Sequence, residues 1–224
     1  MTGPPDRGPA GTLDLAQVRA YGGAVADFTG THELRPGSGR VLVKTGRAGL
    51  AARAGHDLTL EIVRWSARVT VPDAEGGGLS AATVTAELDL GSLAVREGTG
   101  GAKPLTERDR RDIQGTAGKI LGEAAKATFT SSRVIPSSSA SAAPAGGTPA
   151  GGAIEGMLTM RGTSRPLRLQ VVSPAPGQYR GSATVKQTDF GITPYSGFFG
   201  TLKLKDEIGV EFEVTIEEIP NGSA

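Results

Sequence analysis

The feature that most constrains how this chain can fold is an alternation of apolar and polar residues with a period of two. In DEIGVEFEVTIEE, residues 206–218, every second residue from Ile208 to Ile216 is apolar, with Gly, Glu or Thr between them. Successive side chains of a β-strand point to opposite faces, so this pattern predicts a strand with one face in a core and one in water. The same alternation occurs in residues 40–45, 57–65, 82–90 and 156–172.

These segments predict an all-β protein built mainly from antiparallel strands. Roughly nine or ten segments have strand patterns. The continuous apolar runs separated by helices that a parallel sheet requires are not found in the sequence. Antiparallel strands in this number either stack as a sandwich or close into a barrel. A closed barrel of about eight strands has an interior just wide enough for side chains or for one small ligand.

One helical insert and one loop interrupt the strands. Residues 106–124 carry apolar residues at helical spacing, after Thr106 as a candidate N-cap and Asp109 three residues later. Because three glycines fall within this segment, one helix and two short helices are both compatible with it. Residues 136–153 are rich in Ser, Ala, Gly and Pro, which predicts a flexible loop.

The distribution of predicted strands along the chain indicates its domain organisation. The predicted strands before and after the loop show the same alternation of apolar and polar residues. We therefore expect a single barrel domain over residues 37–218 rather than two domains. Residues 1–36 form an extension that we expect to be largely disordered, with a weak helical pattern over residues 13–28. Residues 219–224 are expected to be a disordered tail.

Composition excludes several classes of function. The net charge of +1 gives no reason to expect a nucleic-acid partner. The absence of cysteine excludes disulfides, zinc fingers and thiol catalysis, and two histidines offer little for a metal site, so we expect no metal. The chain starts without a signal-peptide pattern and contains no apolar run long enough to span a bilayer, which predicts a cytoplasmic protein without a transmembrane segment.

Charge is distributed unevenly along the chain. Residues 40–70 contain six Lys or Arg against two acidic residues, whereas residues 207–218 contain five Glu and no basic residue. Two interpretations are open: these charges form the solvated faces of strands, or the basic strands form a docking surface for a protein partner.

Several motifs follow one another in a definite order along the chain. SGRVLVKTGRAGLAARAGHDLTLEIVRW is followed by AELDLGSLAV, by the helical insert, and by KATFTSSRV. LTMRGTSRPLRL, residues 158–169, comes next, and TDFGI at residues 188–192 follows it. This order of motifs resembles the YceI-like family, whose hairpin has the similar pattern G-x-L-T-x-x-G-x-(T/S)-x-P-x-x-L. The resemblance covers residues 37–218.

The resemblance implies an antiparallel lipocalin-like β-barrel that binds an apolar or amphiphilic small molecule: a polyisoprenoid or other isoprenoid, a fatty acid or a fatty amide. No cofactor is implied. The oligomeric state stays open, and a homodimer is possible. The apolar faces of the strands then line a cavity, or alternatively fill the barrel. These residues are Val41, Val43, Leu58, Leu60, Ile62, Val84, Leu88, Leu158, Met160, Leu167, Leu169, Val210, Phe212 and Val214.

Two further residues are candidates for ligand binding. His56, next to Gly55 and Asp57, is either a polar anchor or general base at the pocket mouth, or a ring hydrogen-bonded to backbone at the start of a strand. Phe198, in the aromatic stretch YSGFFG, is either part of a flap over the entrance or part of a plug that closes one end of the barrel.

The function predicted is non-catalytic binding of a lipid-like amphiphile for carriage, storage or stress protection, with no catalytic residue. Two alternatives stay open. One is an enzyme acting on an amphiphilic molecule with His56 as acid or base, although no G-x-S-x-G nucleophile motif is present. The other is a barrel with a filled core that acts as a protein-interaction module.

Overall fold

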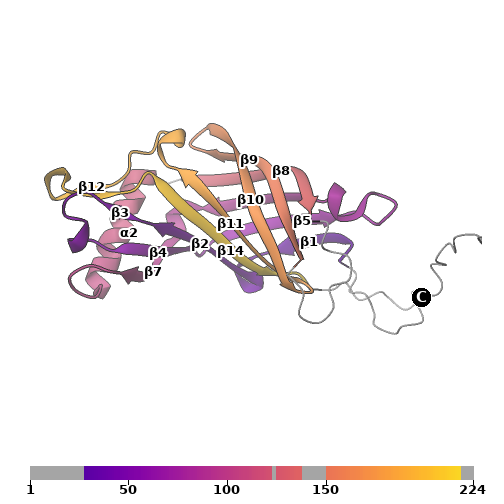
Figure 1. Ribbon diagram of the computed structural model, residues 1–224, viewed down its shortest axis with the longest axis horizontal. Coiled ribbons are helices and arrows are strands. Elements are labelled where there is room, and N and C mark those ends of the chain that lie inside the picture. Colours follow the sequence, from indigo (N-terminus) through magenta and orange to yellow (C-terminus); the bar gives the residue numbers. More distant parts are fainter. Residues whose placement is uncertain (1–27, 123–124, 138–149, 218–224) are drawn as a thin grey trace, which may run out of the picture.

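The computed structural model describes residues 28–122, 125–137 and 150–217, which form one large antiparallel sheet of eleven strands (Figure 1). In the order of their pairing the strands are β1 (Gly30–Leu34), β5 (Trp65–Val71), β6 (Thr83–Asp89), β8 (Lys126–Pro136), β9 (Ala150–Met160), β10 (Thr163–Ala175), β11 (Gln178–Lys186), β14 (Glu207–Thr215), β2 (Gly39–Thr45), β4 (Asp57–Ile62) and β7 (Leu93–Thr99).

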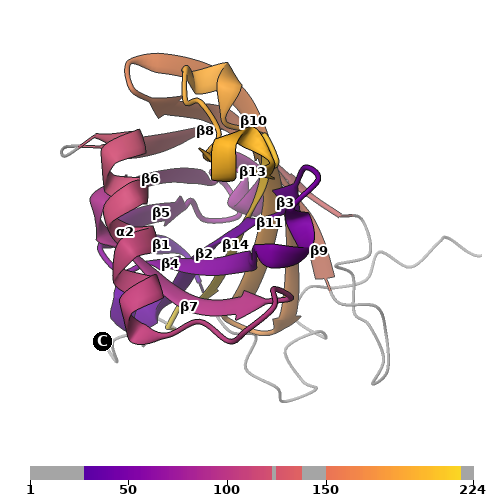
Figure 2. The same cartoon turned by 90° about the vertical axis from the view of Figure 1, so that its left-hand side faces the viewer.

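The sheet closes on itself because three of its strands are bent. β1 continues into β2 through the 3₁₀ turn η1 (Pro36–Ser38), β4 into β5 through two residues, and β6 into β7 through η4 (Leu90–Ser92). The bent strand β1–β2 has β14 on one side and the bent strand β4–β5 on the other, because β2 pairs with both β14 and β4. The strand β4–β5 in turn pairs with β6. Every strand of the ring therefore has two neighbours. The eleven segments therefore make eight continuous strands, and the expected antiparallel barrel is confirmed (Figure 2).

The β9–β10 hairpin shows how local sequence sets the register. Met160 pairs with Thr163, and the two residues between them have positive φ, 51° for Arg161 and 75° for Gly162. Two-residue turns of this kind match the twist of the strands they connect. The turn therefore places Leu158 and Met160 on the same inward face as Leu167 and Leu169.

The helical insert is one helix, α2 (Glu107–Leu121), and it packs against β7 and η4 (Figure 2). Thr106 Oγ1 accepts from the backbone N–H of Asp109 at 3.2 Å, and the Asp109 carboxylate accepts from the Thr106 N–H at 2.8 Å. This reciprocal cap is the one that the sequence predicted. Within the described ranges, no helix combines the length and the apolar character needed to cross a bilayer.

The structure corrects two of the predicted boundaries. β1 lies inside the segment expected to be an extension, residues 1–36, and pairs with β5. Two inward residues, His32 and Leu34, are too short a pattern to stand out in the sequence. Residues 1–27, with the helix predicted over 13–28, lie outside the described residues, as do residues 218–224.

The loop predicted over residues 136–153 is also shorter at both ends. β8 extends to Pro136, β9 begins at Ala150, and Pro136 pairs with Gly152. The glycines at the start of β9 lack the side chains that would have produced an alternating pattern. Residues 138–149 lie outside the described part of the chain.

A second, small sheet lies beyond the barrel at the end where α2 lies (Figure 1). It consists of β12 (Ser196–Gly197), β13 (Leu202–Leu204) and β3 (Arg47–Ala48), paired in that order. The connections that carry it also contain the 3₁₀ turns η2 (Ala52–Ala54), η6 (Thr188–Phe190) and η7 (Phe198–Gly200). A further turn, η3 (Gly78–Ala81), joins β5 to β6.

Candidate ligand-binding site

The apolar residues predicted to line the barrel all lie on the inward faces of its strands. Alternation along each strand puts them opposite exposed polar neighbours, and strand pairing brings them together across the ring. They belong to two contiguous clusters, one around Leu60, Ile62 and Trp65 and the other around Phe129 and Leu158. Val84 alone is not part of either cluster, although it shares the inward face of β6 with Leu88.

The inward residues differ in how completely they are covered. Those on β2, β4 and β9 are buried: Val41, Val43, Leu58, Leu60, Ile62, Leu158 and Met160. Those on β6, β10 and β14 are half-buried: Val84, Leu88, Leu167, Leu169, Val210, Phe212 and Val214. An inward side chain in a closed and fully packed barrel has no contact with solvent. The inward side chains of β6, β10 and β14 therefore keep more contact with solvent than those of β2, β4 and β9.

Glycines on the inward face accommodate aromatic rings. A Cβ atom built on Gly181 of β11 would overlap the ring of Phe212, and one on Gly156 of β9 would overlap the ring of Phe129. Gly181 pairs directly with Phe212. The absent side chains therefore fix where these two rings lie within the barrel.

A few polar groups also lie in the interior, and sequence reasoning did not select them. Trp65 Nε1 and Thr45 Oγ1 are buried and have no hydrogen-bond partner among the described residues. His32 is buried on β1 and donates from Nε2 to the Phe28 carbonyl at 2.9 Å. Tyr179 is half-buried on β11, and burial raises the pKa of its hydroxyl above the usual range.

Of the two interpretations of His56, the structure supports the ring that is hydrogen-bonded to backbone at the start of a strand. Its ring donates from Nε2 to the Lys103 carbonyl at 2.8 Å and lies against Gly101, which has φ 73° and where a Cβ would overlap the ring. His56 thus connects the start of β4 to the segment that precedes α2. Phe198 begins η7 outside the barrel, and its side chain lies outside what the structure describes.

The uneven charge of the chain is explained by strand pairing. β2 and β14 are neighbours, and across them Arg40 bonds to Glu213 at 2.6 Å and Lys44 to Glu211 at 2.7 Å. Arg180 of β11 also contacts Glu213, at 3.3 Å. The basic residues of β2 and the acidic residues of β14 therefore form one solvated outer face with paired charges.

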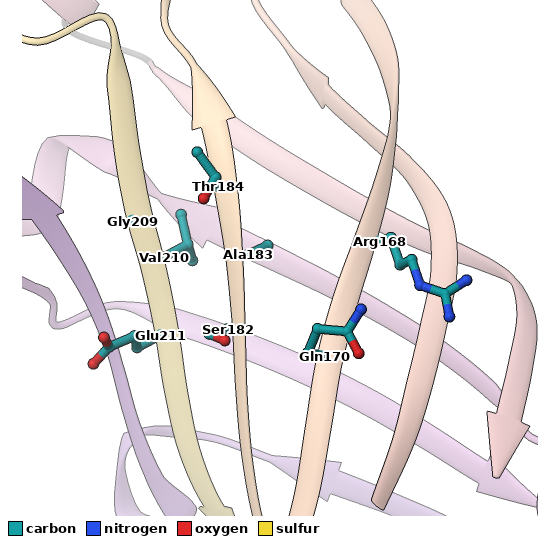
Figure 3. A pocket seen from close by; sticks show the side chains of 8 residues that line it. All are labelled: Arg168, Gln170, Ser182, Ala183, Thr184, Gly209, Val210 and Glu211. Carbon is teal, nitrogen blue, oxygen red and sulfur yellow. The ribbon is translucent and has the colours of Figure 1, made fainter. Parts of the chain in front are cut away.

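A hollow of about 350 Å³ crosses this outer face over β10, β11 and β14 (Figure 3). Most of its lining is polar, from Arg168, Gln170, Ser182, Thr184 and Glu211, together with Gly209 and the paired Ala183 and Val210. A second hollow, of about 390 Å³, lies farther along the same strands around Arg40 and Arg180. Neither has the apolar lining that an aliphatic chain requires. Among the residues the structure describes, no group of three His, Cys, Asp or Glu side chains is placed to hold a metal ion.

A closed ring of antiparallel strands around an apolar interior defines the class of lipocalin-like barrels. A family model described as the YceI-like domain matches residues 51–216, which is 166 of the 224 residues. The chain therefore belongs to the YceI-like family. The barrel begins before the match, because β1 and β2 precede residue 51.

One solved structure agrees on the fold, and another shows a weaker similarity. The crystal structure of BcnA from Burkholderia cenocepacia superposes with a TM-score of 0.50 at 16% identity, covering 80% of this chain and 96% of that one. The crystal structure of a mutant CJ YceI protein made for nanotechnology applications has a TM-score of 0.39 at 17% identity and covers 71% of this chain and 85% of that one. No curated protein is detectably similar in sequence.

Proposed function

We propose that the barrel binds one apolar or amphiphilic molecule, such as an isoprenoid, a fatty acid or a fatty amide, in its interior and does not convert it chemically. The observation that carries the proposal is the half-buried apolar surface on the inward faces of β6, β10 and β14. Apolar side chains that the protein itself leaves partly uncovered gain free energy when a hydrocarbon chain covers them. The family and the barrel fold support the same conclusion.

The size of this gain is compatible with useful affinity. Each buried methylene contributes roughly 0.8 kcal/mol, so ten carbons contribute about 8 kcal/mol before costs. Lost translational and rotational freedom and side-chain ordering oppose binding by several kcal/mol. A micromolar Kd requires about 8 kcal/mol net, so a chain longer than ten carbons that lies against the uncovered strands is needed to reach it after these costs.

The indole of Trp65 supports an amphiphilic rather than a purely hydrocarbon ligand. An unpaired buried donor costs roughly 1–3 kcal/mol, and a carbonyl, hydroxyl or carboxylate oxygen would remove that cost. Trp65 lies in the cluster that also contains Leu60, Ile62 and, in part, Leu88 and Phe212. In our proposal a polar atom of the ligand accepts from Trp65 Nε1 while the chain lies against β10 and β14.

The proposed absence of catalysis is consistent with how the polar residues are placed. His56, the candidate acid or base, is hydrogen-bonded to a backbone carbonyl outside the ring of strands. Arg40 and Glu213 neutralise each other on the outer face. The ligand recovered from the protein should therefore be chemically identical to the ligand supplied.

Native mass spectrometry of the purified protein, followed by organic extraction, tests the proposal directly. A discrete added mass that resolves to a prenyl or fatty amphiphile supports it. If the protein is free of ligand and then takes up neither a long-chain isoprenoid alcohol nor a fatty acid, the proposal is wrong. A modified product, released after incubation with a defined amphiphile, would favour the enzyme alternative.

A pair of neighbouring variants separates a hollow barrel from a filled one. Ala183 faces inward on β11 and pairs with Val210, whereas Ser182 faces outward beside it. Ala183→Phe should abolish ligand uptake by filling the space, with little change in the free energy of unfolding, and Ser182→Phe should leave uptake intact. If the interior is already packed, Ala183→Phe instead destabilises the protein by about 1–3 kcal/mol. Equilibrium unfolding in urea measures the difference.

A further inference from the structure

Two large apolar side chains project fully into solvent at one end of the molecule. Leu50 is 97% exposed, and Phe199 is fully exposed. Leu50 follows β3 and Phe199 lies in η7 before β13, so both belong to the small sheet beyond the barrel (Figure 1). Other exposed apolar residues, such as Leu79 and Val172, retain contact with the protein over about half of their surface.

Backbone bonds hold the two loops that carry these side chains next to each other. Ala51 N–H donates to the Thr201 carbonyl at 2.9 Å, and β13 pairs with β3 through Lys203 opposite Ala48. Gly49 has φ 91°, and a Cβ there would overlap the Thr201 carbonyl, so only glycine permits this approach. We call this end of the molecule, residues 46–56 and 192–205, the small-sheet tip.

The backbone at Phe199 keeps its ring in solvent at a conformational cost. Its φ is 54°, in the left-handed region that a bulky residue rarely adopts. Strained residues of this kind persist where the surrounding structure demands them, and they occur often at sites of function. Here the strain is not compensated by burial, because the ring has no protein covering it.

The charge of the small-sheet tip is entirely positive. Residues 46–56 and 192–205 contain four basic residues and no acidic one. Arg47 is half-buried and bonds to the Gly55 carbonyl and, at 3.7 Å, to Asp57. Arg53, Lys203 and Lys205 are exposed, and none forms an ion pair within the described residues. The outer face of the barrel differs, since Arg40 and Lys44 there are paired with glutamates.

We propose that the small-sheet tip docks on a lipid bilayer that carries anionic headgroups. Leu50 and Phe199 insert among the headgroups, and Arg53, Lys203 and Lys205 lie against lipid phosphates. Apolar anchors surrounded by unpaired basic residues are the combination that binds anionic interfaces, because burial of apolar area and attraction to the negative surface act together. This inference does not depend on the ligand in the barrel, although a membrane is where such a ligand dissolves.

Flotation with extruded vesicles tests the proposal on the full chain. The protein should float with vesicles of phosphatidylcholine that contain about a quarter phosphatidylglycerol, and much less with phosphatidylcholine alone. Leu50→Ser with Phe199→Ser should weaken binding at least about tenfold, since each side chain loses its burial in lipid. Leu79→Ser, in η3 between β5 and β6, is the matched control and should bind like the unaltered protein.

Charge and insertion are tested separately. Replacing Lys203 and Lys205 with Gln should weaken binding roughly fivefold for each, and raising NaCl from about 0.1 M to about 0.5 M should weaken it further. Phe199→Trp should give a blue-shifted emission and quenching by brominated lipid when vesicles are added, over the constant signal of the buried Trp65.

Three results would overturn the proposal. One is failure to float with anionic vesicles. Another is equal binding by the Leu50/Phe199 double variant, whose melting temperature should be unchanged because neither side chain is packed. The third is a stable dimer in sedimentation velocity that the same double variant dissociates, because the tip would then be covered by a second copy of this chain.

Discussion

At the scale of single residues, the interior of the barrel depends on side chains that are absent. Gly181 and Gly209 lie on neighbouring strands, β11 and β14, but they face opposite sides of the sheet. A Cβ on Gly181 would overlap the Phe212 ring, whereas one on Gly209 would lie 3.6 Å from Lys44 Cβ, an ordinary contact. The same substitution therefore has opposite consequences at the two positions.

Gly181→Ala should destabilise the protein by about 1–3 kcal/mol, because the Phe212 ring must leave its place. Gly209→Ala, the matched control, should be neutral or slightly stabilising, since alanine reduces the freedom of the unfolded chain. Urea unfolding of the two variants and the unaltered protein gives the difference. Equal free energies of unfolding for the two variants would contradict this account of how Phe212 is positioned.

At the scale of elements, alternation predicts strands well but loses their phase at bends. Ile62 and Trp65 both face inward, although an odd step of three residues along a regular strand would put them on opposite faces. They share a face because Val63 and Arg64, between them, form the β4–β5 bend. The Ser92 carbonyl accepts from Val63 N–H at 3.4 Å, and the Arg64 carbonyl accepts from Asp89 N–H at 3.0 Å, so the pairing is kept.

This bend explains which part of the candidate site the sequence could predict. Leu58, Leu60 and Ile62 follow from period two, and their inward placement was predicted. Trp65 falls out of phase with them and was missed as a site residue. The half-buried state of Phe212 was also beyond sequence reasoning, because it depends on ring closure between distant strands. His32 was missed because β1 contributes only two inward residues.

The N-terminal cap of α2 makes an element-scale prediction that depends on pH. Hydrogen bonds from the Thr106 hydroxyl and backbone lower the pKa of Asp109 below its usual value of 3.8. A carboxylate whose pKa is lowered on folding stabilises the folded state above its unfolded pKa, and this contribution is lost as pH falls through the folded pKa. The cap should therefore weaken in acid.

Thr106→Ala should lower the free energy of unfolding by about 1 kcal/mol at neutral pH. The difference from the unaltered protein should begin to shrink below about pH 3.8 and continue to shrink through the lower pKa of folded Asp109, because protonation removes the carboxylate that accepts from Thr106. Urea unfolding at neutral pH and near pH 3 provides the comparison. A difference that stays constant across this range would show that Asp109 does not act through the cap.

At the scale of the whole molecule, the apolar interior and the charged exterior are separated by one layer of strands. Arg40 and Lys44 face solvent and pair with glutamates of β14, while Val41 and Val43 between them are buried. The uneven charge along the sequence is thus a consequence of which strands become neighbours. Arg53, Lys203 and Lys205 of the small-sheet tip have no such acidic partner among the described residues.

A ligand in the barrel should stabilise the whole fold, because the unfolded chain has no interior to offer it. Ligand present at 100 times its Kd adds about 2.7 kcal/mol. The melting temperature should therefore fall after solvent extraction and recover when the extracted amphiphile is returned, while Ala183→Phe should not respond. Recovery of equal size in Ala183→Phe would mean that the amphiphile acts outside the barrel.

The pairing of β14 with β2 has a consequence for biosynthesis. The last barrel strand of the chain must find the strand formed from residues 39–45, so the ring cannot close until nearly all of the described sequence has left the ribosome. Until then β2 and β11 present unpaired edges, which are templates for association between chains. Nascent copies of this protein therefore expose strand edges to one another until synthesis is nearly complete.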